Sequence, residues 1–142
     1  MMKVIGFTLS AIFFLLSFIH LYWGFGGMWG VSSVMPINQN GEKLLKPGCI
    51  GSFIVAIGLA LIGLLFLIKI GMIHFLLPAF ILKNGLWLIA FLFLIRAIGD
   101  FKYVGFFKKI KSTPFGMMDT SFYSPFCLIV AALTTILQLM NI

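Results

Sequence analysis

The chain of 142 residues is 62% hydrophobic and 9% charged, and its mean hydropathy is +1.19. A soluble domain of this length cannot bury so much apolar surface, so the composition excludes an ordinary water-soluble protein and predicts a membrane protein. The formal charge is +7, from ten Lys and Arg against three Asp and Glu. In a membrane protein such an excess of basic residues indicates how the chain is oriented and where it contacts anionic lipids, and it argues against nucleic-acid binding.

The first predicted transmembrane helix covers residues 4–23 and ends in the amphipathic His20, Tyr22 and Trp23, which suit the headgroup boundary. Its apolar run is also compatible with a signal peptide. However, residues 22–26 lack a small-x-small cleavage pattern, and three further apolar spans follow. We therefore expect a first helix that is retained.

The second predicted helix covers residues 47–68 and follows a long connection, 24–46, that contains turn-forming and charged residues. Pro47 is tolerated in the first turn of a helix, because its missing N–H would have no partner there. Ser52, Ala56 and Ala60 recur every four residues. This spacing of small residues lets another helix approach closely.

The third predicted helix covers residues 72–95, and the tight connection 69–71 requires it to run antiparallel to the second. Pro78 is expected to kink this helix. Lys83 would lie about twelve residues, or roughly 18 Å, along it, which is near the middle of the bilayer. Because an unpaired ammonium group is costly to bury, we expect Lys83 to be uncharged, to extend toward the headgroups, or to face a polar cavity and a partner such as Asp119.

Residues 96–123 mix basic and aromatic side chains, which is typical of a segment that lies in the membrane interface against anionic headgroups. Ser124 and Pro125 then have the pattern of a helix N-cap followed by a first-turn proline. A fourth, shorter helix is therefore predicted over residues 125–140. The predicted fold is one all-α domain over residues 1–142, an antiparallel bundle of four transmembrane helices with an interfacial segment between the third and the fourth.

Four spans place both long connections on one membrane face and both termini on the other. The terminal face carries Lys3 and Lys69, whereas the long-connection face carries seven basic residues. By the positive-inside rule we expect a multi-pass protein of the cell (plasma) membrane, with cytoplasmic long connections and both termini outside. The seven basic residues are Lys43, Lys46, Arg96, Lys102, Lys108, Lys109 and Lys111.

Polar residues that are distant in sequence gather on the long-connection face in this topology. Arg96 and Asp100 are spaced i, i+4 and would pair if the third helix continues past Ile98. In one interpretation they are an ordinary helix-end ion pair, with Asp119 as a cap and His20 as an interface residue. In the other they form a polar pocket, roofed by aromatic side chains, that binds an amphipathic ligand. The candidate ligand-binding residues are His20, Trp23, Trp29, Lys83, Arg96, Asp100, Asp119 and Tyr123.

The two cysteines, Cys49 and Cys127, form neither a CxxC motif nor a Cys/His cluster, which argues against a thiol-redox enzyme and against a structural zinc site. No nucleophile elbow, phosphate loop or metal-binding helix motif occurs, so we expect no metal and no cofactor. On the cytoplasmic side, both thiols are expected to remain free.

Three stretches of the sequence carry a resemblance to a known family: residues 20–30 (HLYWGFGGMWG), residues 96–101 with 105–108 (RAIGDF and GFFK), and residues 119–125 (DTSFYSP). Together they resemble an uncharacterised bacterial family of small four-span integral membrane proteins, a domain of unknown function, over nearly the whole chain. The resemblance implies the four-helix fold and supplies no activity. Its signature positions include the candidate residues above, except Lys83.

The favoured function is binding of a lipid or hydrophobic small molecule in the polar pocket of the long-connection face, in a protein that acts as an accessory or sensor. The alternative is an intramembrane enzyme acting on lipid or isoprenoid-like substrates, with His20 or Asp119 as acid/base and Arg96 holding an anionic group. A small transporter ranks third, because four-helix drug exporters depend on a carboxylate in the first span, which here has none. Expected partners are membrane lipids, with anionic headgroups at the basic segment, and a homo-oligomer is compatible with the sequence.

Overall fold

The computed structural model describes residues 1–36, 38, 40–42 and 48–140. Within these ranges the chain is helical and contains no strand, which confirms the predicted all-α class. Four helical segments are long and apolar enough to cross a membrane: Met2–Gly24, Cys49–Lys69, Ala79–Ile98 and Pro114–Met140. The predicted second span starts at Pro47, which lies outside the described residues.

The first pair of helices, α1 (Met2–Gly24) and α3 (Cys49–Lys69), is held by matching hydrogen bonds. The Ser10 hydroxyl donates to the Gly63 carbonyl at 2.8 Å, and the Ser17 hydroxyl donates to the Ala56 carbonyl at 2.7 Å. Ser17 follows Ser10 along α1, whereas its partner Ala56 precedes Gly63 along α3, so the two helices run in opposite directions. Gly63 and Ala56 are buried at these contacts, so small residues on α3 do allow α1 to approach closely.

The second pair consists of α4 (Ala79–Ile98) and a longer helical segment. That segment contains α5 (Pro114–Met118), a π-helical turn labelled η1 (Asp119–Tyr123) and α6 (Ser124–Met140). The fourth helix therefore begins eleven residues earlier than the predicted start at Pro125. Its cap is Thr113, whose hydroxyl oxygen accepts from the Gly116 N–H at 3.0 Å.

Ser124 and Pro125 lie inside this continuous helix, although their pattern predicted its start. The backbone N–H of Ser124 bonds to the Asp119 carbonyl five residues earlier, as in a π-helix. A proline in a regular α-helix would crowd the carbonyl four residues before it. The widened turn just before Pro125 offers a physical reason why the helix passes through this proline.

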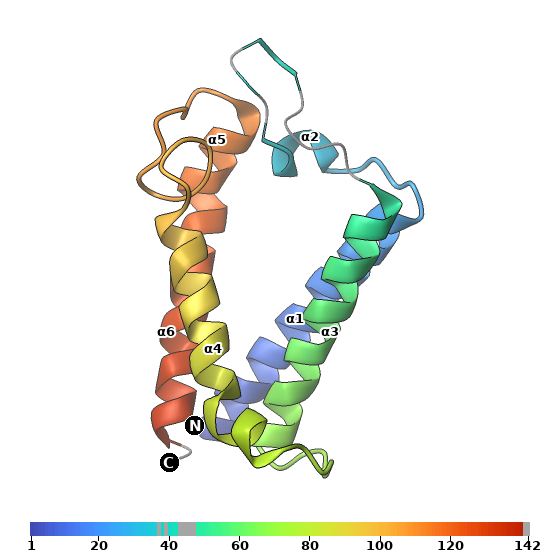
Figure 1. The fold of residues 1–142 in the computed structure, drawn as a ribbon, viewed down its shortest axis with the longest axis vertical. Coiled ribbons are helices and arrows are strands. Elements are labelled where there is room, and N and C mark those ends of the chain that lie inside the picture. Colours follow the sequence, from blue (N-terminus) through green and yellow to red (C-terminus); the bar gives the residue numbers. More distant parts are fainter. Residues whose placement is uncertain (37, 39, 43–47, 141–142) are drawn as a thin grey trace.

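The two pairs lie close together at the end that holds both termini and the 70–78 connection, and they splay apart toward α2 (Val31–Val34) and α5 at the other end (Figure 1). The shared core lies at the closed end, where all four long helices contribute buried apolar side chains. It contains Leu9, Phe13, Phe66, Ile70, Leu86, Ile89, Val130 and Leu137. The helices therefore form two packed pairs that are joined by a core at one end.

Two expectations about the third helix are wrong. Pro78 lies immediately before α4, in extended conformation, and so it does not kink the helix. Lys83 is consequently the fifth residue of α4, about 6 Å from its start rather than 18 Å along it. This lysine lies near the 70–78 connection, in the first turns of the helix, and it is exposed.

Candidate functional site

A buried ionic cluster, which we call the Asp119 cluster, joins the last turn of α4 to the π-helical turn. Asp119 is 0% exposed, and its Oδ1 accepts from Arg96 Nη2 at 2.9 Å. Its Oδ2 accepts from the Gly105 N–H at 2.7 Å, from Lys108 Nζ at 3.0 Å and from the Ser124 hydroxyl at 3.2 Å. Both carboxylate oxygens are therefore occupied by groups of the chain itself.

Lys108 is the member of this cluster that sequence reasoning missed. It is 2% exposed, and its ammonium group also donates to the Gly105 carbonyl at 2.9 Å and to the Thr120 hydroxyl at 2.6 Å. In the sequence it stands in a basic run beside Lys109 and Lys111, both of which are exposed. Nothing in the spacing of the run distinguishes the buried lysine from its neighbours.

Asp100 does not pair with Arg96, and the predicted i, i+4 ion pair is wrong. Helix α4 ends at Ile98, and Gly99, with a φ of 84°, turns the chain away from the helix axis. Asp100 Oδ1 instead accepts the backbone N–H groups of Lys102, Tyr103 and Val104, at 2.9, 2.8 and 2.9 Å. Asp100 therefore orders the turn that brings Gly105 and Lys108 to Asp119.

The electrostatics of Asp100 follow from these contacts. Partial burial raises the pKa of the carboxyl group, but the N–H groups of Val104, Lys102 and Tyr103 stabilise the anion and lower the pKa more, so it lies below its ordinary value. In the Asp119 cluster, by contrast, two cationic side chains face one carboxylate. Because Arg96 and Lys108 both pair with Asp119, the cluster carries one excess positive charge. Among the described residues Arg96 Nη1 is also buried without a hydrogen-bond partner.

Three of the other predicted residues of the long-connection face, His20, Trp23 and Trp29, form a separate group, whereas Tyr123 lies beside the Asp119 cluster. His20 Nδ1 contacts the Leu16 carbonyl of its own helix at 2.8 Å, and its ring meets Trp23 edge-on at 4.9 Å. The Trp23 indole N–H donates to the Trp29 carbonyl at 2.8 Å, while the Trp29 side chain is exposed. Tyr123 packs on Phe115 and Phe122 beside the Asp119 cluster. The described hydrogen bonds and ring contacts do not join the two groups, and a single pocket beneath the long connections stays a prediction.

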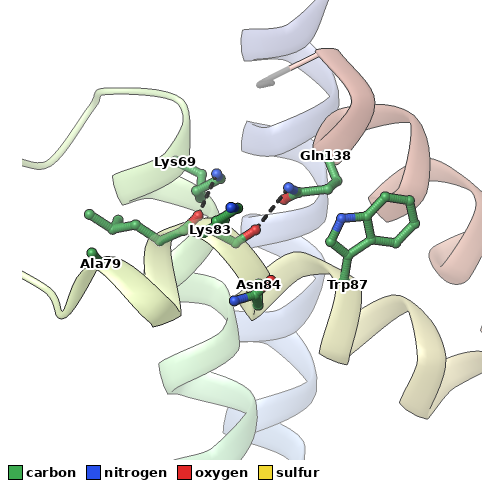
Figure 2. Close-up of a pocket in the computed structure, with 7 residues that line it drawn as sticks. Lys69, Ala79, Lys83, Asn84, Trp87 and Gln138 are labelled. Carbon is green, nitrogen blue, oxygen red and sulfur yellow. Dashed lines mark hydrogen bonds between the residues drawn. The ribbon is translucent and has the colours of Figure 1, made fainter.

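A cavity of about 470 Å³ lies at the opposite end of the second helix pair, among side chains from α3, α4 and α6 (Figure 2). We call it the polar cavity after its Lys, Asn and Gln side chains, although most of its lining surface is apolar. Lys69 Nζ donates to the Leu82 carbonyl at 2.8 Å, and Gln138 Nε2 donates to the Lys83 carbonyl at 3.0 Å. Gln138 is 3% exposed, and its Oε1 has no partner among the described residues. The lining also includes Ala79, Asn84 and Trp87.

A larger apolar groove of about 830 Å³ runs between α3 and α4. Its lining is aliphatic and aromatic apart from the amide of Asn84, and it includes Leu65, Phe80 and Leu92. Asn84 and Trp87 line both this groove and the polar cavity, so the two spaces adjoin. Of the predicted site residues, Lys83 lines the polar cavity and none lines the groove.

Lys69 and Gln138 are the site residues at this end that sequence reasoning did not select. The signals that could have found them are a lysine at the end of one apolar span facing a lysine at the start of the next, and the single amide in the last span. Elsewhere, Cys49 and Cys127 are free thiols, as predicted. The described residues contain no group of three or more His, Cys, Asp or Glu side chains that could hold a metal ion.

Comparison with protein families gives one match. The family model described as "Protein of unknown function (DUF3995)" matches residues 13–134, which include the Asp119 cluster, the aromatic group around Trp23, and Lys69 and Lys83. Gln138 lies just beyond the matched range. No curated protein and no solved structure matches the chain.

Proposed function

The chain belongs to this family of proteins of unknown function, and we propose that it is a multi-pass membrane protein that binds one anionic, lipid-like amphiphile at the α3–α4 face. One observation carries the proposal: a polar cavity that contains two lysines adjoins an apolar groove. The apolar tail of the ligand lies in the groove. Its anionic head lies against Lys69 and Lys83.

The distribution of charge supports an anionic head. The chain has three acidic side chains, Glu42, Asp100 and Asp119. Glu42 bonds to Asn38 in the connection after α2, and the other two bond within the turn and the cluster at the end of α4. No acidic side chain is therefore left to neutralise Lys69 and Lys83, and a basic residue near a membrane surface attracts an anionic lipid by about 1 kcal/mol.

The size of the groove supports a ligand with an apolar tail. Pockets that bind small molecules usually have volumes of roughly 300–1,000 Å³ and mostly apolar linings. The groove, at about 830 Å³, lies in this range, and its lining is almost entirely apolar. A lipid whose tail lies along the groove can pass Asn84 and Trp87, which line both spaces, and place its head in the polar cavity.

The proposed site lies at the terminal face, not at the long-connection face where a pocket was predicted. With Lys83 near the start of α4, the terminal face carries Lys3, Lys69 and Lys83, and seven of the ten basic residues remain on the other face. The positive-inside rule still favours cytoplasmic long connections. The proposed head-binding cavity then opens toward the outer leaflet.

The contacts of the Asp119 cluster favour binding over intramembrane catalysis. A general acid or base has to reach the substrate, but Asp119 is fully buried and its oxygens already accept from four groups. His20, the other acid/base candidate, contacts its own helix and Trp23 rather than Arg96. We therefore assign the cluster a structural role.

Native mass spectrometry of the purified protein with phosphatidylglycerol or phosphatidylcholine tests the proposal. We expect preferential retention of the anionic lipid, and a loss of about 30-fold in its affinity in the double variant Lys69→Met/Lys83→Met, because two contributions of about 1 kcal/mol are removed. Lys3→Met is the control, since it removes the charge of an exposed lysine on the same membrane face that lies outside the cavity and outside the basic segment 96–123. Equal retention of both lipids, or a loss in Lys3→Met as large as that in the double variant, would contradict the proposal.

A further inference from the structure

Gln138 gives the polar cavity a hydrogen-bond acceptor that the protein leaves unused. Its Nε2 donates to the Lys83 carbonyl at 3.0 Å, and this contact fixes which end of the amide is the nitrogen, because a carbonyl can only accept. The Oε1 atom is therefore an acceptor. It has no donor among the described residues, although the side chain lines the cavity. The atom itself is buried beside the cavity, so a ligand reaches it when the amide shifts locally toward the cavity, as side chains commonly do on binding.

A buried acceptor without a donor is costly, so a ligand that supplies the donor gains more than the hydrogen bond alone. The donor has to be compatible with Lys69 and Lys83, which line the same cavity. A cationic ammonium donor is repelled by two lysines, whereas a hydroxyl group is neutral and donates equally well. The two lysines of the cavity thus attract an anion, while Gln138 Oε1 is best satisfied by a neutral donor.

We infer that the headgroup bound in this cavity carries a free hydroxyl group beside its anionic phosphate, and that Gln138 Oε1 accepts from that hydroxyl. The inference rests on the proposed lipid-binding function and narrows it to polyol-phosphate headgroups. Phosphatidylglycerol belongs to this class. Phosphatidylmethanol has the same charge but no hydroxyl, and phosphatidylcholine is zwitterionic and has no donor.

Thr134 provides a matched control on the same helix. Its hydroxyl is also buried without a partner among the described residues, and it lies one turn before Gln138. It does not line the polar cavity. If burial of an unpartnered polar group alone affected lipid binding, replacing either residue would have the same effect. If Gln138 selects the headgroup, only its replacement changes the selectivity.

The test compares the binding of phosphatidylglycerol and phosphatidylmethanol to the full-length protein by native mass spectrometry. We expect the hydroxylated lipid to bind about five-fold more tightly to the unmodified protein, as one hydrogen bond to a buried acceptor provides. The ratio should fall to about one in Gln138→Met and stay unchanged in Thr134→Val. The comparison on the unmodified protein needs no variant, so it decides the matter even if Gln138→Met does not fold.

Equal binding of the two anionic lipids to the unmodified protein overturns the inference, and so does a preference that survives in Gln138→Met. In both cases tighter binding than that of phosphatidylcholine would show that the proposed function itself stands. If neither anionic lipid binds more tightly than phosphatidylcholine, the proposed function fails and the inference fails with it.

Discussion

The two ends of the α4–α6 pair differ in whether their charged and polar side chains have partners within the chain. At the Asp119 cluster the carboxylate is buried and its oxygens accept four hydrogen bonds from the chain. At the other end Lys69 and Lys83 have no acidic side chain to neutralise them, and the buried Gln138 keeps an unused acceptor. A polar group whose partners lie within the chain stabilises the fold. A polar group that lies beside a cavity and has no partner within the chain is better placed to bind a ligand.

The largest effect is expected at Asp119, because Arg96 and Lys108 lose their only anion when it is replaced. Asp119→Asn keeps the shape of the side chain but leaves two cations uncompensated, which costs about 3–5 kcal/mol for a buried pair. Thermal unfolding in detergent measures the loss. Glu42→Gln, which changes the same charge at an exposed carboxylate, serves as the control and should have little effect. Equal melting of the two variants would remove the cluster's structural role.

A smaller effect is expected at Lys108. Lys108→Met removes charged hydrogen bonds to Asp119 and to the Gly105 carbonyl, but Arg96 still neutralises the carboxylate. We expect a loss of about 2 kcal/mol, as for a hydrogen bond to a charged group. The neighbouring Lys109→Met, at an exposed position, should be nearly neutral in the same unfolding measurement. A Lys109 variant that is as unstable as the Lys108 variant would contradict the burial of Lys108.

At the other end, loss of a buried polar group should not destabilise the protein. Gln138→Met removes one hydrogen bond, to the Lys83 carbonyl, and also removes an unpartnered acceptor. These two effects oppose each other, so unfolding in lipid-free detergent should change by less than about 1 kcal/mol. A loss as large as that of Asp119→Asn would mean that both ends serve the fold alone.

The smallest effect concerns the turn at Asp100. Its pKa in the folded protein lies below the ordinary value of about 3.9, so the stabilisation is present above that pH and is lost as the pH falls through the lowered pKa. Amide hydrogen exchange at Lys102, Tyr103 and Val104, measured relative to the core of α4, should therefore lose protection on acidification. Asp100→Asn should remove most of this pH dependence, and an unchanged pH response in that variant would contradict the assignment.

The helical class and the four spans could be predicted from hydropathy and charge, because the bilayer constrains both strongly. Arg96, Asp119 and Lys83 were also predicted as candidate residues, whereas Lys108, Lys69 and Gln138 were not. The partner of Arg96 could not be predicted. Asp100 is four residues away in sequence, whereas Asp119 reaches Arg96 only because Gly99 ends α4 and the following turn folds back. A glycine can end a helix, as Gly99 does, but the i, i+4 spacing of Arg96 and Asp100 favours a helix that continues.

The predicted depth of Lys83 and the predicted start of the fourth helix were wrong for a related reason, the position of a proline relative to a helix start. The depth of Lys83 depended on whether Pro78 lies inside the helix or before it, and the start of the fourth helix depended on whether Pro114 or Pro125 marks it. Pro78 precedes α4, and Pro114 opens the last helix, whereas Pro125 is carried through it by a π-helical turn. The two adjoining spaces are lined by side chains of α3, α4 and α6, and hydropathy gives no register between these helices. Their polar lining could therefore not be assembled from the sequence.

Photo-crosslinking tests the contrast between the two ends most directly. A photoreactive residue replaces Asn84, which lines both cavities, or Leu128, an exposed apolar residue of α6, in membranes that contain phosphatidylglycerol. We expect a lipid adduct at position 84 that is lost in the Lys69→Met/Lys83→Met background, and an adduct at position 128 whose yield does not depend on those lysines. Adducts of equal yield at both positions, unchanged when the lysines are removed, would contradict the proposed site.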